Sequence, residues 1–375
     1  MVEKRQFPHH LIREIFEQPD GLRRTIEPRV SLEQGVVRLE EVQIPREELR
    51  AVRSINIIAS GTSRHAGIAG QFMAQELAGV HVDVDYASEF ENRNPAIGSC
   101  ELSIFITQSG ETADTTGALR EAKQRGSRTI AISNVVGSTI AREADGVIYT
   151  HAGPEISIAS TKAFTAQIAC LFMFALYLGQ VKEKVSQAVA RRYIGELLAL
   201  PGKIETILAS ADQCEQLAER YHRVEDFMFL GRAIHYPIAM DGALKLKEIS
   251  YIHAEGYPTG EAKHGPNALI DYRLPLVMIA TCDPGDAGSV LRYEKNVGNM
   301  EGFKKQGATV IALATEGDTK IPQLANHTFF IPKAPELLSP ILEIVPLQLL
   351  AYYIAAKRGL DVDRPRNLVK SVTIE

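Results

Sequence analysis

The stretch DGALKLKEISYIHAEGYPTGEAKHGP, residues 241–266, gathers ionisable side chains at spacings that could support proton transfer. Lys245 and Glu248 are three residues apart, so on a helix they share one face, while Lys247 points elsewhere. Such a pair can be a surface salt bridge worth less than about 1 kcal/mol, or its carboxylate can act as a general base and acid. The apolar Ile249 belongs to an expected buried stripe beside Glu248. Spacing alone favours the surface salt bridge.

A second set of polar residues forms three hydroxyl-rich turns, at 60–63 (SGTS), 108–115 (QSGETADT) and 159–165 (ASTKAFT). Backbone N–H groups and the helix dipole at such turns attract an anion, and Ser109 and Thr112 could add hydroxyl donors. Each turn alone is more often structural, because serine and threonine are ordinary N-cap residues. Three of them in one domain predict a phosphate site.

Elements that would position these residues follow from the pattern of apolar runs. INIIASG, LSIFITQSG, TIAISN and GVIYTH predict strands, with segments of helical period between them. Strand, helix and strand in this order predict parallel strands in an open α/β sheet. The charge-free run at 163–181 approaches the roughly 20 residues that span a bilayer, but Thr165, Gln167 and Gln180 favour a buried helix.

The same order of elements recurs in the second half of the chain. FMFLGRAIHYPIAM echoes INIIASGTSRHAGIA, and LPLVMIATCDPGD echoes LSIFITQSGET. We therefore expect two copies of one α/β domain joined by a helical segment. The second copy reads TCDPGDAGS at its equivalent turn, where Asp283 and Asp286 would repel an anion. The sequence thus predicts one phosphate site, in the first copy.

Composition narrows the functional class. The 375 residues include 41 Lys plus Arg and 46 Asp plus Glu, and this net charge of -5 argues against nucleic acid as a partner. The four cysteines form no C-x-x-C pair, which favours reduced thiols over disulfides or a metal site. The N-terminus lacks a signal-peptide pattern, so we expect a cytoplasmic protein without a membrane partner. Neither a Walker A loop nor G-x-G-x-x-G is present, and we expect no cofactor.

Several ordered motifs resemble one enzyme family. SGTS, QSGETADT, EISIASTKAFTAQ, GALKLKEISYIHAE, KHGPNALID and DVDRPRNLVKSVTIE are similar to the isomerase half of glucosamine-6-phosphate synthase, also called glutamine–fructose-6-phosphate aminotransferase (isomerizing). The resemblance runs from about residue 10 to the last residue. It implies two tandem SIS (sugar isomerase) domains, each a doubly wound, mostly parallel α/β sheet flanked by helices, and a C-terminal tail.

The chain also departs from the family pattern. Ser60 stands where the family commonly has Cys, Thr107 where it has Ser, and Asp241 where it has Glu. The chain begins with Met1 and Val2 instead of the family's glutaminase domain and its N-terminal cysteine, so we expect no glutamine hydrolysis.

The resemblance assigns roles to four residues. Glu248 would carry the proton between C1 and C2 of the sugar, and Lys245 would balance the negative charge of the enediol or enolamine. His264 of KHGP would open the sugar ring. Lys370 would form an imine with the open-chain ketose, although on position alone it would be a solvated tail charge. The sugar phosphate would bind Gly61, Thr62, Ser63, Thr107, Gln108, Ser109, Thr112 and Ser160.

The implied activity is interconversion of fructose 6-phosphate and glucosamine 6-phosphate without the chain's own glutaminase. Because the family's KHGP histidine reaches the active site of the neighbouring subunit, the resemblance also implies a homodimer with shared active sites. A separate glutaminase subunit is an open alternative as a partner. One alternative is a glucosamine-6-phosphate deaminase or another ketose/aldose phosphate isomerase. Another is a non-catalytic SIS protein that senses a sugar phosphate, although Glu248, His264 and Lys370 together favour an enzyme. Sequence does not fix the flux direction, the exact sugar or the ammonia source.

The expected domain organisation follows from the repeat and the resemblance. The predicted parts are an N-terminal helical segment at 1–40, a phosphate-binding SIS domain at 41–190, a helical connector at 191–212, a second SIS domain at 213–360 and a catalytic tail at 361–375.

Overall fold

The computed structural model describes residues 6–98 and 101–370, so Met1, Val2, Cys100 and the last five residues lie outside the described part. The chain divides into two compact units. The first-repeat unit comprises Asp20–Glu155, Lys162–Pro201 and the tail from Val369. The second-repeat unit comprises the segment up to Pro19, Ile156–Thr161 and Gly202–Leu368.

The first-repeat unit contains a sheet of five parallel strands in the order β4-β3-β5-β6-β7. Side chains of successive residues point to opposite faces, and both faces are buried, as in other parallel sheets. The apolar runs of the sequence therefore became central strands. The strands are β3 (Ser54–Ala59), β4 (His81–Tyr86), β5 (Glu101–Thr107), β6 (Arg128–Ser133) and β7 (Gly146–Tyr149).

Helices cover both faces of this sheet. Ile58 and Phe105 pack on one face with α5, α6 and α7, while α4 and α8 pack together and α4 lies on β3. Gly67 allows that close approach, because a Cβ there would lie 2.8 Å from Cγ2 of Ile57. The helices are α4 (Gly61–Ala78), α5 (Ala87–Phe90), α6 (Ala113–Gln124), α7 (Thr139–Glu143) and α8 (Lys162–Val181).

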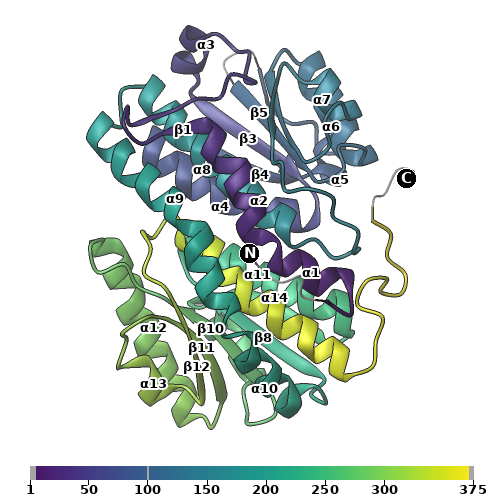
Figure 1. The fold of residues 1–375 in the computed structure, drawn as a ribbon, viewed down its shortest axis with the longest axis vertical. Helices are drawn as coiled ribbons and strands as arrows, with labels where there is room; N and C mark the ends of the chain where they lie inside the picture. Colours follow the sequence, from purple (N-terminus) through teal and green to yellow (C-terminus); the bar gives the residue numbers. More distant parts are fainter. Residues whose placement is uncertain (1–5, 99–100, 371–375) are drawn as a thin grey trace. The chain divides into compact units, whose positions relative to one another are not determined.

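The second-repeat unit contains a second five-stranded parallel sheet, in the order β12-β11-β10-β8-β9. In Figure 1 its strands β8, β10 and β11 lie among the green segments, whereas β3 and β5 of the first sheet lie among the blue ones. The strands are β8 (Asp226–Gly231), β9 (His253–Pro258), β10 (Pro275–Ala280), β11 (Thr309–Thr315) and β12 (His327–Ile331).

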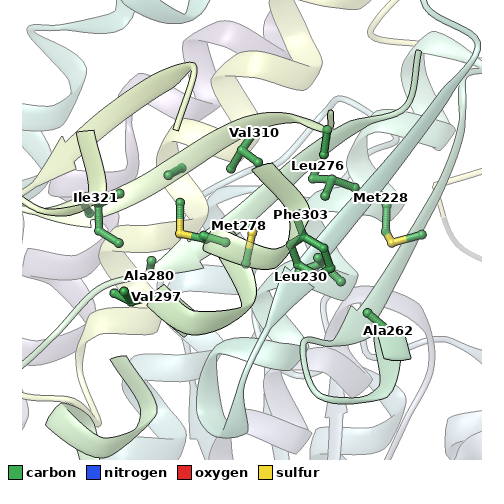
Figure 2. Packing of buried hydrophobic residues seen from close by; sticks show 14 of the residues in the cluster. Met228, Leu230, Ala262, Leu276, Met278, Ala280, Val297, Phe303, Val310 and Ile321 are labelled. Carbon is green, nitrogen blue, oxygen red and sulfur yellow. The ribbon is translucent and has the colours of Figure 1, made fainter. Parts of the chain in front are cut away.

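One face of the second sheet packs on α12 and α13. Figure 2 shows Met228, Leu276 and Met278 of the strands in one core cluster with Phe303 of α12. Both α1 and α11 pack against α14 within the same unit, and Figure 1 shows the purple α1 beside the yellow α14. The helices are α1 (His10–Phe16), α10 (Ala211–Tyr221), α11 (Tyr236–Ser250), α12 (Ala287–Lys305), α13 (Ile321–Leu324) and α14 (Ser339–Lys357), with short 3₁₀ turns η2 (Ala233–His235), η3 (Glu261–His264) and η4 (Pro266–Leu269).

The remaining elements are short, apart from one long helix. The division between the two units falls inside that helix, α9 (Gln187–Leu208), between Pro201 and Gly202. The others are α2 (Gln18–Ile26), η1 (Glu27–Arg29), the β1–β2 ribbon (Val30–Ser31 and Val36–Val37) and α3 (Arg46–Ala51).

Among the residues that the structure describes, two helices, α8 and α14, have the length and apolar character that could cross a membrane. Each is a core helix here, with 89% of its most apolar window buried inside the protein. Gln167 in α8 and Gln348 in α14 are both 1% exposed. The prediction of a buried helix over residues 163–181 is confirmed.

The two sheets have the same strand order, so β3 and β5 of the first sheet correspond to β8 and β10 of the second. This order, with a chain reversal beside the first strand, is that of a doubly wound fold. The predicted α/β class with two tandem parallel sheets is confirmed.

Candidate functional site

In the first-repeat unit, the carboxyl ends of β3 and β5 lie side by side, with Ala59 paired to Ile106. The chain leaves β3 through α4 toward β4 and leaves β5 through α6 toward β6, so the two connections diverge. A doubly wound sheet binds ligands in the crevice at such a switch point. The structure therefore brings together the predicted binding residues at 60–63 and at 107–112.

The turn after β5 has a fixed backbone. Gly110 has a left-handed φ of +72°, and a Cβ at this position would lie 2.1 Å from Oγ of Ser138. Thr107 is 4% exposed and its Oγ1 accepts the Gly110 N–H at 3.2 Å. The threonine that replaces the family's serine at position 107 thus keeps a hydroxyl, and this hydroxyl stabilises the turn by a hydrogen bond.

Thr112 is the N-cap residue of α6, but its side chain makes no capping hydrogen bond. Its Oγ1 instead lies 3.3 Å from Oγ1 of Thr107. Ser109 Oγ accepts the Glu111 N–H at 3.2 Å, and the Gln108 carbonyl accepts the Asn134 N–H at 3.2 Å. A helix start whose N-cap side chain does not cap the backbone N–H groups, with hydroxyls around it, suits an anion.

The turn after β3 lies at the same edge of the sheet as the turn after β5. Gly61 has a left-handed φ of +52°, and a Cβ built there would meet nothing within 4 Å beyond its chain neighbours and the nearby backbone of its own helix. Ser60, the N-cap of α4, makes no side-chain capping bond. Thr62 is 9% exposed, and Oγ of Ser63 accepts a hydrogen bond from Nε2 of Gln167 at 3.0 Å. Helix α8 thus fixes Ser63.

The remaining predicted binding residue is Ser160. It belongs to Ile156–Thr161, which is part of the second-repeat unit, and its side chain is half-buried. Its place at the phosphate stays a prediction.

Helix α11 of the second-repeat unit carries the predicted proton-transfer pair. Nζ of Lys245 donates to Oε2 of Glu248 at 2.6 Å, with the lysine side chain 2% and the glutamate 21% exposed. Lys247 is exposed. Removing an ammonium from water costs several kcal/mol unless a partner compensates it, so this is not the surface salt bridge that spacing alone favoured.

Close packing fixes the face of α11 from which this pair projects. A Cβ at Gly242 would lie 2.7 Å from Leu347 in α14 and 3.1 Å from Phe229 in β8. The helix ends at Ser250, and its C-cap residue, Tyr251, adopts a left-handed φ of +60°. Glycine thus allows α11 to lie against the sheet, as Gly67 does for α4.

The other two predicted catalytic residues lie on irregular segments. His264 ends the 3₁₀ turn η3, is exposed, and precedes Gly265, whose φ is +148°. In the first-repeat unit, Nζ of Lys370 donates to Oε2 of Glu155 at 2.8 Å. Lys370 is therefore not a solvated tail charge, and Glu155 is a residue that sequence reasoning missed.

In the second sheet, the turn that corresponds to residues 107–112 contains carboxylates that bond to the chain itself. Asp286 caps α12 by accepting the Ser289 N–H at 2.7 Å. Asp283 accepts the Gly285 N–H at 2.9 Å. Glu336 accepts from Oγ of Ser289 and from Nε of Arg292, the latter at 2.6 Å. These contacts give a physical basis for the predicted restriction of phosphate to the first copy.

A buried histidine joins this carboxylate cluster. Nδ1 of His235 lies 2.8 Å from Oε1 of Glu343, and its Nε2 lies 3.0 Å from Oε1 of Glu336. Burial lowers the pKa of His235, but the charges and hydrogen bonds of Glu343 and Glu336 outweigh it and raise the pKa to about 10. Burial raises the pKa of Glu336, but the hydrogen bond and charge of His235, with Ser289 and Arg292, lower it to about 2. His235 was not among the site residues predicted from the sequence.

Residues 6–98 and 101–370 contain no group of three or more His, Cys, Asp or Glu side chains arranged to hold a metal ion. Cys170, Cys214 and Cys282 are free thiols. Burial raises the pKa of Cys170 to about 12, so this thiol is inert.

Comparisons with known proteins agree with this architecture. The SIS domain family matches residues 48–177 and 222–358. The chain is 46% identical over 374 residues to glutamine–fructose-6-phosphate aminotransferase [isomerizing] of Thermus thermophilus, covering 100% of this chain and 60% of that protein. The chain thus spans about 60% of the length of that curated relative.

Solved structures of related proteins have the same fold as this chain. The C-terminal domain of glucosamine-fructose-6-phosphate aminotransferase from Francisella tularensis superposes with a TM-score of 0.89 at 34% identity, covering 97% of this chain and 100% of that domain. A glucosamine-6-phosphate deaminase from Thermotoga maritima shares the fold, with a TM-score of 0.73 at 23% identity over 97% of this chain and 99% of that one. The chain therefore belongs to the SIS domain family, with two SIS domains, and is a homologue of the C-terminal, isomerase part of glutamine–fructose-6-phosphate aminotransferases.

Proposed function

We propose that this chain interconverts fructose 6-phosphate and glucosamine 6-phosphate, with ammonia as the nitrogen donor or product. The observation that carries the proposal is the buried Lys245 ammonium held 2.6 Å from Glu248 on α11. The name of the relative that is 46% identical supports the same chemistry.

Glu248 carries the proton in this proposal. Isomerisation moves hydrogen between C1 and C2, so one carboxylate must remove a proton from one carbon and return it to the other. With 21% of its side chain exposed, Glu248 is reachable, whereas its buried partner Lys245 supplies a fixed positive charge. That charge stabilises the enediol or enolamine in which negative charge develops.

The phosphate of the substrate binds at the switch point of the first sheet. Gly61, Thr62 and Ser63 line one side, and Thr107, Gln108, Ser109 and Thr112 line the other. The carboxylates that occupy the corresponding place in the second sheet support a single phosphate site per chain.

His264 and Lys370 complete the proposal. The exposed position of His264 on η3 suits a role in the active site of a neighbouring subunit, which makes the active form a homodimer. Lys370 forms an imine with the open-chain ketose. A separate glutaminase subunit would supply ammonia in the synthetic direction.

The second candidate function is a non-catalytic sensor of the same sugar phosphate. The crevice of the first-repeat unit would be sufficient for a sensor, but a sensor does not need the buried ammonium–carboxylate pair on α11. Only an enzyme would exchange hydrogen at C1 or C2 of the sugar, so hydrogen exchange distinguishes the two functions.

The experiment incubates the purified chain in deuterated water, with fructose 6-phosphate plus ammonium in one arm and glucosamine 6-phosphate in the other. Incorporation of deuterium at C1 or C2, with product formed in at least one arm, is the expected result. Saturable binding of both sugars without deuterium incorporation would replace the enzyme proposal with the sensor. The faster arm identifies the preferred direction.

A further inference from the structure

Lys370 is held by a buried partner although it lies on an irregular tail. Its Nζ lies 2.8 Å from Oε2 of Glu155, whose side chain is 0% exposed, while Lys370 itself is 27% exposed. The preceding residue, Val369, is 65% exposed. The tail thus turns one ammonium group toward an internal carboxylate and leaves part of that side chain open to a ligand.

Glu155 is fixed in position by the start of α8. Its Oε1 accepts the Ala163 N–H at 3.2 Å, in the first turn of this 20-residue helix. A carboxylate is favoured there by the helix dipole. The second carboxylate oxygen is the one that contacts Lys370. One oxygen therefore anchors the residue and the other holds the amine.

The loop before Glu155 is also fixed from two sides. Arg24 donates to the carbonyl of His151 at 3.0 Å and to that of Ala152 at 2.9 Å. Asn134 donates from Nδ2 to the carbonyl of Gly153 at 2.9 Å. Together with the Ala163 contact, these bonds hold Glu155 in place.

We propose that Glu155 positions Lys370 and takes the proton of its ammonium group before the amine attacks the sugar. This inference rests on the proposed function. A protonated lysine cannot add to a carbonyl, so imine formation requires an acceptor for one proton within hydrogen-bond reach. Glu155 meets that requirement at 2.8 Å.

The step balances in protons and bonds. Lys370 Nζ transfers one proton to the Glu155 carboxylate, and its freed electron pair forms a bond to the carbonyl carbon of the open-chain ketose. The π pair of the carbonyl moves to its oxygen, which takes a second proton from the nitrogen and becomes the hydroxyl of the carbinolamine. The resulting carbinolamine loses its hydroxyl as water after taking the proton back from Glu155. The products are the protonated imine of Lys370, one water and the regenerated carboxylate. No oxidant, reductant or metal takes part.

A purely structural role for Glu155, as the cap of α8, is the competing explanation. It predicts that the variants lose stability and phosphate binding together. The positioning role predicts instead a selective loss of the imine, because the phosphate residues at 61–63 and 107–112 come from other elements of the same unit.

The test traps the imine with borohydride in the presence of fructose 6-phosphate and measures, by mass spectrometry, the rate at which Lys370 is modified. Glu155→Gln should reduce this rate about 10²-fold or more, since general acid–base groups contribute 10² to 10⁴. Glu155→Asp keeps the carboxylate one methylene shorter and should recover part of the rate. The affinity for fructose 6-phosphate should change less than about three-fold in either variant.

The matched control is Asp145→Asn. Asp145 also accepts a backbone N–H, that of Thr129 at 2.9 Å, and also pairs with a lysine, Lys123 at 3.2 Å, in the same unit. This variant should trap the imine at the wild-type rate. Equal trapping rates for wild type and Glu155→Gln would overturn the inference. It would also be overturned if Glu155→Gln and Glu155→Asp lowered the trapping rate equally and both lowered the affinity for the sugar phosphate to the same extent.

A failure of the proposed function can be distinguished from a failure of the role of Glu155 alone. If the wild-type chain forms no trapped adduct and incorporates no deuterium, the proposed function fails and this inference fails with it. If the wild-type chain forms the adduct and Glu155→Gln forms it equally fast, only the role of Glu155 is wrong.

Discussion

Nδ1 of His235 lies 2.8 Å from the carboxylate of Glu343, although the two residues are 108 positions apart in the chain. Both side chains are almost fully buried, at 2% and 0% exposure. The histidine follows β8 through η2, and the glutamate lies inside the apolar helix α14. This ionic contact therefore links the carboxyl end of the second sheet to the core helix that covers it.

Replacing His235 by Gln should destabilise the folded protein by about 3 to 5 kcal/mol, because it leaves the buried Glu343 carboxylate without its cation. Urea unfolding of the two proteins measures the difference. The control is His253→Gln, whose partner Asp226 is 58% exposed, and which should change stability by less than about 0.5 kcal/mol. Similar changes in the free energy of unfolding for the two substitutions would show that the buried contacts of His235 do not stabilise the fold as proposed.

The same network gives stability a pH dependence. The pKa of His235 is raised to about 10, so the folded state binds this proton more tightly than the unfolded state does. The stabilisation is complete below the unfolded pKa of about 6.5 and is lost as the pH rises through about 10. The difference in unfolding free energy between wild type and His235→Gln should therefore be larger at pH 6 than at pH 9.5. A difference that grows with pH would contradict the assigned charge of His235.

Thr112→Val should weaken sugar-phosphate binding about ten-fold. It removes a hydroxyl donor to a dianion, and hydrogen bonds to charged groups contribute about 1.5 to 3 kcal/mol. Thr116→Val is the matched control, since its Oγ1 bonds the Thr112 carbonyl within α6 and it is 6% exposed. Isothermal titration with fructose 6-phosphate measures both. If Thr116→Val weakens binding as much as Thr112→Val does, the hydroxyl of Thr112 is not a ligand to the phosphate.

The proposed shared site can be tested by subunit mixing. His264→Ala and Glu248→Gln chains should each be inactive, whereas a mixture that exchanges subunits should regain part of the activity, because one of the two sites then has both native residues. Light scattering should show a dimer. A fully active monomer, or a mixed dimer without activity, would show that His264 acts within its own chain or not at all.

The α/β class and the repeat could be predicted from the sequence because they leave local patterns. Strands buried on both faces read as continuous apolar runs, and the same run-and-helix order occurs twice. The difference between the two copies was also local, because Asp283 and Asp286 stand where the first copy has hydroxyl residues. Spacing likewise placed Lys245 and Glu248 on one helical face.

The long-range partners could not be predicted in the same way. Glu155 and Lys370 are 215 residues apart, and no periodicity relates a helix start to the end of the chain. Spacing also misjudged how deeply Lys245 is buried, because burial depends on how α11 packs against β8 and α14 through Gly242. These properties follow from tertiary packing.

Deuterium exchange in Glu248→Gln tests the central claim most directly. Gln keeps the volume of Glu248 but cannot carry the proton, so incorporation of deuterium at C1 or C2 of the sugar phosphate should fall about 10² to 10⁴-fold, with phosphate affinity nearly unchanged. Lys247→Gln, on the exposed side of the same helix, should exchange at the wild-type rate. Wild-type exchange in Glu248→Gln, or an equal loss in a folded Lys247→Gln protein, would contradict the assignment of Glu248 as the proton carrier.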